Sequence, residues 1–518
     1  MAAVKLEATA TVNSSATVCR LTTADNSNTI SWRTITGLSP KRIIRACFPF
    51  VIYCTIQRRR TSPTGLNTNH CDGARSRDTC AQNHPTRFSI SDIPLAATAE
   101  DAARWQLAGS YRVRFETLDN SFRANMAGSD QLLVSRLLVG IKGRGEHVFG
   151  EIEVGDSRAW QDDSSTPLGT DDVNTLEPLQ AYIGWRAGPS SNLALKAGRM
   201  TLDIGSRRLV ARNRFRNTLN TFDGVHADWR RGAWYWQAIY TRPVRRLPGE
   251  RDKLDTNEQQ TDRSHSGTRF WGLHSSYNGS GSRRLEAYLF ALGEKDGADL
   301  STRKRAIKTL GVRLLKPASP DSWDYEMEAA YQFGESRATA GAADIAELDH
   351  RAVFAHFHYG YQFADRWASR ILLQADYASG DDDPLDSENN RFDTLYGARR
   401  FEFGPTGIYG AFARGNILSP GLRWQFRGND TLSGFLGYRA VWLASAGDAL
   451  TTAGVRNSGA DWERFVGQQL EVRLRFAPAA RVRAEFGAAY LHKGPLLDQA
   501  AAQRGDSTYW YSQLSYQL

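Results

Sequence analysis

Apolar and polar residues alternate strictly in many short segments between residue 110 and the end of the chain. In the first segment, Tyr111 and Val113 occupy one parity and Arg112 and Arg114 the other. A sustained period of two is typical of a β-strand with one apolar and one polar face. The chain is therefore predicted to be all-β, with eighteen strands at residues 110–116, 135–142, 147–154, 179–186, 193–198, 225–230, 234–241, 269–277, 284–291, 309–314, 324–333, 353–362, 370–377, 422–426, 433–442, 469–476, 481–490 and 508–518.

The links between these segments alternate between short and long. Every second link is brief: GRGE, AGPSSN, RG, NGSGS, KPASPDS, ADRWAS, RGND and AP. The others are long and rich in Asp, Asn, Gly and Arg. Bacterial outer-membrane barrels have short periplasmic turns and long extracellular loops, whereas sandwiches and propellers lack this parity. We predict a single transmembrane antiparallel up-and-down β-barrel of about eighteen strands.

Hydropathy and the last segment agree with a barrel. The mean hydropathy is −0.48, and no apolar run approaches the roughly 20 residues of a spanning helix. A β-barrel can cross a membrane with a low mean hydropathy and without a long apolar run, because only every second strand residue faces lipid. The final segment alternates up to Leu518, in place of the usual terminal aromatic residue. We expect outer-membrane lipid and the outer-membrane assembly machinery as partners, and a monomer.

The first hundred residues differ from the rest. They contain all five cysteines, and residues 1–97 carry a net charge of +7 out of +9 for the chain. An A-x-A signal-peptidase motif ends at Ala99, although polar residues precede it. We expect residues 1–99 to be a misassigned start, a signal-peptide remnant or a disordered extension, and residues 100–518 to be the barrel. The remainder is nearly neutral, which removes the main support for nucleic-acid binding.

The polar parity of the strands must face the lumen, because lipid cannot satisfy charge. A cationic wall attracts anions, and guanidinium groups bind carboxylates bidentately. Each inward arginine could instead serve structure by pairing with an inward glutamate. The candidate pore residues on strands are Arg112, Arg114, Lys142, Arg423, Arg439, Arg473, Arg475, Arg481 and Arg483.

A second group of arginines lies in the loop of residues 195–229, LKAGRMTLDIGSRRLVARNRFRNTLNTFDGVHADW. The alternation of short and long links places this loop outside the cell. There it would form a cationic rim, or fold into the mouth of the channel and narrow it. Arg199 and Asp223 share the lipid-facing parity, so either Gly198 and Gly224 permit bulges or the two residues pair above the membrane edge. We favour the pair, with the remaining arginines left for a polyanion: Arg207, Arg208, Arg212, Arg214 and Arg216.

The sequence gives little indication of metal binding or catalysis. His356 and His358 share an inward face but have no evident third metal ligand. A position on the polar, lumen-facing side of the strand therefore explains these histidines better than metal binding does. Asp381, Asp382 and Asp383 form an acidic loop that lacks the spacing of a calcium-binding hand, and a weak Ca²⁺ site is the alternative. No nucleophile and base are held together on strand faces. We therefore expect no enzyme activity and no cofactor.

Three motif blocks resemble the alginate export family. They are the glycine-arginine strand end with its RL pair and TFDG turn, the segment YASGD with the following RFDTLY, and NILSPGLRW at residues 416–424. The resemblance implies an eighteen-stranded barrel for passive export of an anionic polysaccharide. The residues of this chain that match the family's motif positions are Arg199, Arg208, Asp223, Gly224, Asp376, Asp381, Phe392 and Asp393.

The functional prediction is an anion-selective outer-membrane channel for an anionic polysaccharide such as alginate, or for a related organic anion. The first rival is a porin-like uptake channel for small solutes. The second is a barrel enzyme or adhesin whose loops carry the activity.

Overall fold

The computed structural model describes the backbone of residues 6–13 and 16–23, and residues 104–518 except 127, 189, 299 and 458–462. The chain divides into two compact units, Met1–Phe88 and Ser89–Leu518. In the first unit, β1 (Leu6–Asn13) and β2 (Ala16–Thr23) form an antiparallel hairpin. The motif that ends at Ala99 lies outside the described residues, so the boundary at residue 100 stays a prediction.

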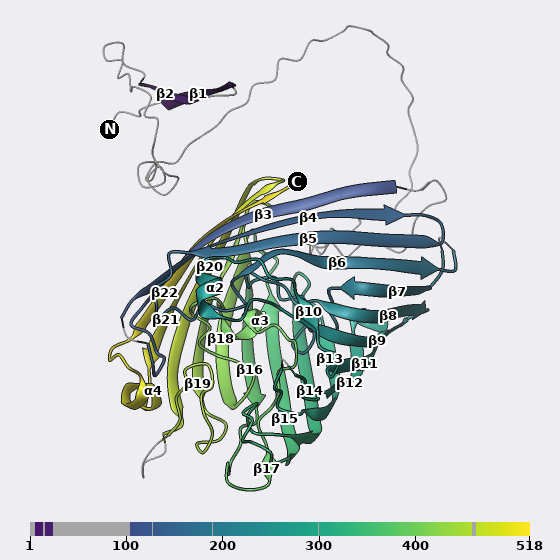
Figure 1. Cartoon of the computed structure of the whole chain (residues 1–518), viewed down its shortest axis with the longest axis vertical. Helices are drawn as coiled ribbons and strands as arrows, with labels where there is room; N and C mark the ends of the chain where they lie inside the picture. The colour runs from purple at the N-terminus through teal and green to yellow at the C-terminus, as the bar shows by residue number, and fades with distance from the viewer. Residues whose placement is uncertain are drawn as a thin grey trace. The chain divides into compact units, whose positions relative to one another are not determined.

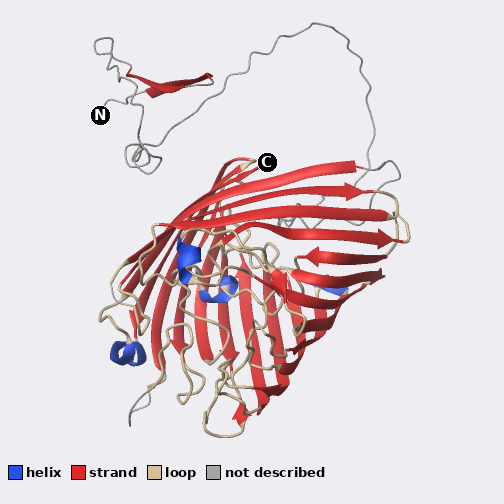
Figure 2. Cartoon of the chain, viewed as in Figure 1, coloured by secondary structure: helices blue, strands red, loops and turns tan. Residues whose placement is uncertain are grey.

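The second unit is a closed antiparallel β-barrel of eighteen strands, as predicted (Figures 1 and 2). All eighteen predicted segments lie within or overlap these strands. The strands are β3 (Arg104–Asp119), β4 (Asp130–Arg144), β5 (Val148–Trp160), β6 (Asn174–Arg186), β7 (Leu193–Met200), β8 (Phe222–Arg231), β9 (Trp234–Arg245), β11 (Arg269–Asn278), β12 (Arg284–Gly293), β13 (Ala306–Lys316), β14 (Ser322–Ser336), β15 (Leu348–Gln362), β16 (Arg370–Ala378), β18 (Ile417–Arg427), β19 (Leu432–Trp442), β20 (Phe465–Ala479), β21 (Val482–Lys493) and β22 (Ser507–Gln517).

Short elements lie in the links between the barrel strands. They are α2 (Arg251–Asp255), β10 (Arg263–Ser264), η2 (Ser280–Ser282), β17 (Glu388–Asn389), α3 (Arg400–Phe403) and α4 (Pro495–Ala500). The strand β22 pairs with β3, which closes the barrel, and β9 pairs with β11. Within the described part of the chain, no helix is long and apolar enough to cross a membrane.

The two parities of each strand face different surroundings. Leu137, Val139 and Ile141 on β4 are exposed, whereas Arg112 and Arg114 on β3 are buried. The apolar residues therefore cover the outside of the barrel, where lipid replaces water. The alternation predicted this arrangement, and the structure confirms it.

The lumen contains a core that the alternation does not predict. Residues 201–221 and 379–416, which we together call the plug, fold inward from the end of the barrel where the long loops lie. Val210 and Tyr396 form a parallel bridge between the two segments. Their buried side chains belong to one apolar cluster with the inner wall, including Leu209, Phe392 and Phe403. The barrel is thus filled at this end by its own loops.

Candidate channel lumen and mouth

The ends of β7 and β8 are joined by the ion pair that the sequence suggested. The Arg199 Nε atom lies 2.7 Å from the Asp223 Oδ1 atom, and the two residues are directly opposite in the sheet. Gly198 and Gly224 also lie opposite each other without a shift of register, so there is no bulge at this point. Their φ angles are +128° and +159°, and a Cβ atom at Gly198 would overlap the carbonyl oxygen of Ala181. The pair therefore fixes the base of the loop that follows.

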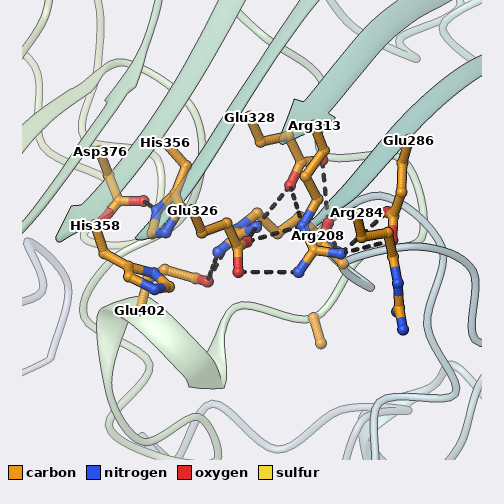
Figure 3. A network of polar contacts seen from close by, with 12 residues as sticks. Arg208, Arg284, Glu286, Arg313, Glu326, Glu328, His356, His358, Asp376 and Glu402 are labelled. Atoms are coloured by element: carbon orange, nitrogen blue, oxygen red, sulfur yellow. Dashed lines mark hydrogen bonds and ion pairs between the residues drawn. The ribbon is translucent and has the colours of Figure 1, made fainter. Parts of the chain in front are cut away.

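Arg208 joins the plug to the barrel wall (Figure 3). Its guanidinium group donates hydrogen bonds to Glu326 and, at 2.6 Å, to Glu328, both on the inward face of β14. It also lies 2.9 Å from Glu402 in α3. Arg313 on β13 pairs with Glu326 at 2.9 Å and neutralises part of the same cluster. One plug arginine is thus held by three buried carboxylates.

The other arginines of the plug also have partners within the protein. Arg212 lies 2.7 Å from Glu153, Arg216 lies 2.6 Å from Asp171, and Arg214 pairs with Asp203. Arg207 stacks over the Phe401 ring at 4.3 Å. The expectation that these arginines are left unpaired for a polyanion is therefore wrong. Glu153 and Asp171 come from other parts of the chain, which a single sequence does not bring together, whereas Asp203 lies in the same segment as Arg214.

Inward arginines of β3 and β4 hold the backbone of the plug. Arg112 donates hydrogen bonds to the carbonyl oxygens of Arg214, Phe215 and Arg216 at 2.9–3.2 Å. Arg114 donates to the Phe215 carbonyl oxygen at 2.7 Å and pairs with Glu116. Arg136, which the sequence did not single out, donates to two of the same carbonyls. Turn carbonyls that would otherwise be buried without a donor are satisfied by these side chains.

Each of the two inward histidines lies beside an aspartate. His356 Nδ1 lies 2.7 Å from Asp376, which also pairs with Arg439 at 3.1 Å. His358 lies 3.4 Å from Asp324 on β14. Among the residues that the structure describes, no group of three or more His, Cys, Asp or Glu side chains could hold a metal ion. This finding includes the acidic loop at Asp381, Asp382 and Asp383, where the weak Ca²⁺ alternative gains no support.

The motif residues Phe392 and Asp393 anchor the second plug segment. The Phe392 ring lies 5.4 Å from the Phe354 ring on β15. Asp393 accepts a hydrogen bond of 2.8 Å from Arg305, and its backbone N–H donates to Gln332 on β14. Both residues therefore attach the plug to the wall.

A different arrangement is found toward the ends of β18 to β21 where the short turns lie. We call the inward cations Arg423, Arg427, Arg473, Arg475 and Arg483 the basic wall. The guanidinium groups of Arg423 and Arg473 lie on the Phe435 ring, each 4.6 Å from its centroid. Within the described residues, the Arg473 side chain has no hydrogen bond and no ion pair, and its Nε atom is buried without a partner. Arg475 pairs with Glu485.

Two candidate cations outside the basic wall, Arg481 and Lys142, also lie near the short turns. Arg481 and Arg483 are exposed. Lys142 on β4, three strands from β21, lies 3.5 Å from Glu151. The basic wall therefore keeps several positive charges that protein carboxylates do not neutralise.

Two cavities lie against the plug and share Thr394, Leu395, Ala413 and Arg414 in their walls. Their volumes are about 640 and 340 Å³. The lining includes several arginines that the sequence did not single out: Arg245, Arg246 and Arg399 in the larger cavity, and Arg303, Arg305 and Arg391 in the smaller one. These residues are scattered over several loops, and the sequence contains no signal that brings them together.

Charged side chains at the larger cavity interact with one another. Burial alone would raise the pKa of the Asp171 carboxyl, but Arg216 and Arg246 lower this pKa to about 2. Burial lowers the pKa of Arg399 to about 10, so its guanidinium group stays protonated at neutral pH. The cavity at the mouth is therefore lined by fixed positive charge.

The family model described as "Alginate export" matches residues 104–509, which is nearly the whole barrel. The chain belongs to the alginate export family. A search of the curated proteins finds no match to the sequence. The family and the closed eighteen-stranded barrel place this member in the outer membrane of a Gram-negative cell.

Solved structures of Pseudomonas aeruginosa share the fold of this alginate export family member. OccK9 (OpdG) is 14% identical with a TM-score of 0.53, over 80% of this chain and 98% of that chain. OccK3 (OpdO) is 15% identical with a TM-score of 0.50, over 80% and 95%. The outer membrane protein OpdK, solved with vanillate, is 15% identical with a TM-score of 0.50, over 80% and 98%. At these identities the likeness establishes the fold alone.

Proposed function

We propose that the protein is a passive, anion-preferring channel for a carboxylate-bearing polysaccharide such as alginate, or for related organic anions. The basic wall carries this proposal, because it holds positive charge that the protein does not cancel. A cationic pore lining lowers the energy of an anion in transit. Arginine remains charged at physiological pH and matches the geometry of a carboxylate. The proposal includes no catalytic role.

One observation favours a second candidate, an uptake channel for small organic anions. The plug fills the lumen at the end of the barrel with the long loops and attaches to the wall through buried ion pairs. A polymer can pass only if the plug moves, whereas a small carboxylate needs only a narrow path. The structure of OpdK with vanillate contains such a carboxylate in a barrel of the same fold.

Ion selectivity in planar bilayers tests the channel. The wild-type barrel is expected to pass anions over cations at ~0.1 M salt, where screening is modest. The double variant R473E/R475E should move the reversal potential toward cation selectivity. R366E is the matched control, because Arg366 is an exposed residue in the short turn between β15 and β16. Cation preference in the wild type, or an unchanged reversal potential in R473E/R475E, would contradict the proposal.

Transport assays distinguish the two candidates. Proteoliposomes containing the wild-type barrel are loaded with uronate oligomers of increasing length or with a small aromatic carboxylate. Release of long oligomers supports polysaccharide export. Release of the small carboxylate alone assigns the channel to small organic anions.

A further inference from the structure

Three basic side chains form a row on the outer surface of the barrel, within four consecutive strands. They are Arg242 on β9, Arg269 on β11 and Lys308 on β13, and all three are exposed. On each strand, the basic residue is the next outward-facing residue after an exposed apolar one. In every case the basic residue lies nearer the long loops. These apolar residues are Tyr240, Trp271 and Leu310. The row therefore borders the lipid-facing band at its extracellular edge.

The two arginines of this row are next to each other and have no protein anion. Thr241 is paired with Phe270 in the sheet, so Arg242 and Arg269 occupy adjacent positions on β9 and β11. In the described part of the chain, neither side chain takes part in a hydrogen bond or an ion pair. Asp223 lies opposite Arg242, but its carboxylate is bound by Arg199. Like charges in neighbouring positions repel each other, which favours an external counter-anion.

Space for such an anion lies between Arg269 and Lys308. The intervening strand β12 presents Gly293 opposite Arg269 and Ala291 opposite Lys308. No atom lies within 4 Å of the position that a Cβ of Gly293 would take. Two strand spacings separate β11 from β13, which is about 10 Å. The open surface is at Gly293, beside Arg269, because Ala291 is buried and the Lys308 ammonium group lies 5.8 Å from the centroid of the Phe333 ring on β14.

The opposite arc of the barrel lacks this arrangement. The residues in the corresponding outward positions of β20, β21, β22, β3 and β4 are Gln468, His492, Thr508, Asp119 and Gln131. None is lysine or arginine, and His492 is paired with Asp506 at 3.0 Å. The basic row is thus a local feature of one side and not a uniform property of the rim.

We propose that Arg242, Arg269 and Lys308 bind the phosphorylated headgroup of a glycolipid in the outer leaflet. The row lies at the border between the apolar band and water, which is the level of lipid headgroups. Basic clusters beside a membrane-spanning segment attract anionic headgroups, and guanidinium groups bind phosphate bidentately. A soluble substrate on its way through the lumen would not meet these outward-facing side chains. The bound lipid would fix one side of the barrel in the leaflet.

Native mass spectrometry of the full-length barrel in detergent, titrated with bisphosphorylated lipid A, tests this inference. One cation near an anionic surface contributes roughly fivefold to affinity, so R242Q/R269Q/K308Q should bind on the order of a hundredfold more weakly. The double variant R242Q/R269Q should fall between this variant and the wild type. R283Q/K316Q/R366Q removes the same charge near the short turns and should bind as the wild type does. Heat-modifiable migration in gels confirms that each variant is folded.

Three outcomes would overturn the inference. The first is equal binding of lipid A by the wild type and R242Q/R269Q/K308Q. The second is equal binding of lipid A and its dephosphorylated form by the wild type. The third is displacement of the lipid by millimolar inorganic phosphate, which would make the row a site for free phosphate. The reversal potential of R242Q/R269Q/K308Q should equal that of the wild type, so this test is independent of the channel proposal.

Discussion

The plug and the basic wall are both rich in arginine, but they use it differently. In the plug, Arg208, Arg212 and Arg216 each lie within 2.9 Å of a carboxylate. In the basic wall, Arg473 lies on an aromatic ring, and Arg475 is the one member that has a close carboxylate, Glu485, among the described residues. A charge that is paired and buried contributes to structure, whereas an unpaired charge beside the lumen contributes to the field felt by an ion. The number of arginines therefore says less about conduction than the placement of the acidic residues.

The largest expected effect comes from breaking the plug contact. R208A removes the cation shared by Glu326, Glu328 and Glu402, and loss of one partner of a buried ion pair costs about 3–5 kcal/mol. We expect the plug to detach from β14 and single-channel conductance to rise several-fold. The control is R284A, because Arg284 is half exposed and lies 3.9 Å from Glu286. An R208A barrel with wild-type conductance and stability would show that the plug is held elsewhere.

The fold was predictable from the sequence for a physical reason. Lipid outside and water inside impose a period of two on every strand, as at Tyr111 to Phe115, and membrane topology imposes the alternation of link lengths. The plug was not predictable in the same way. Its apolar residues, such as Leu209 and Val210, are few and irregular, and they are buried only because two loops far apart in sequence meet at Tyr396.

The candidate site also has a part that the sequence predicts and a part that it does not. Parity predicts which strand arginines face inward, among them Arg473 and Arg475. Parity could not show which strand arginines are neutralised, because their carboxylates can be far away in the sequence, as Asp376 is from Arg439 at a separation of 63 residues. The pair between Arg199 and Asp223 was predictable, because a strand end and a turn in one motif already bring these residues together. Long-range pairing is a property of the closed barrel, and a single sequence carries little signal for it.

A smaller effect should follow from releasing a cation within the basic wall. E485Q removes the carboxylate that pairs with Arg475, so one more positive charge acts on the lumen. We expect higher anion selectivity, measured as a shift of the reversal potential opposite to that of R473E/R475E. Tyr511 donates a hydrogen bond of 2.6 Å to Glu485, and glutamine can still accept it. E151Q, near Lys142 on β4, serves as a comparison and should give a smaller shift, because Glu151 lies 3.5 Å from its lysine. An unchanged potential in E485Q would mean that Arg475 does not act on permeating ions.

The smallest effect is expected at the mouth, where Asp171 bridges Arg216 and Arg246 at 2.6 Å each. Because its pKa is lowered to about 2, the carboxylate stabilises the folded mouth at all pH values above the ordinary aspartate pKa. This contribution is lost only as the pH falls from about 4 through about 2. The Asp171 side chain is 46% exposed, so solvent screening limits its contribution to roughly 1 kcal/mol. D171N should therefore raise hydrogen exchange in residues 161–173 and 213–221 at pH 7, and the difference from the wild type should vanish near pH 2. A difference that persists unchanged at pH 2 would show that the carboxylate charge is not its cause.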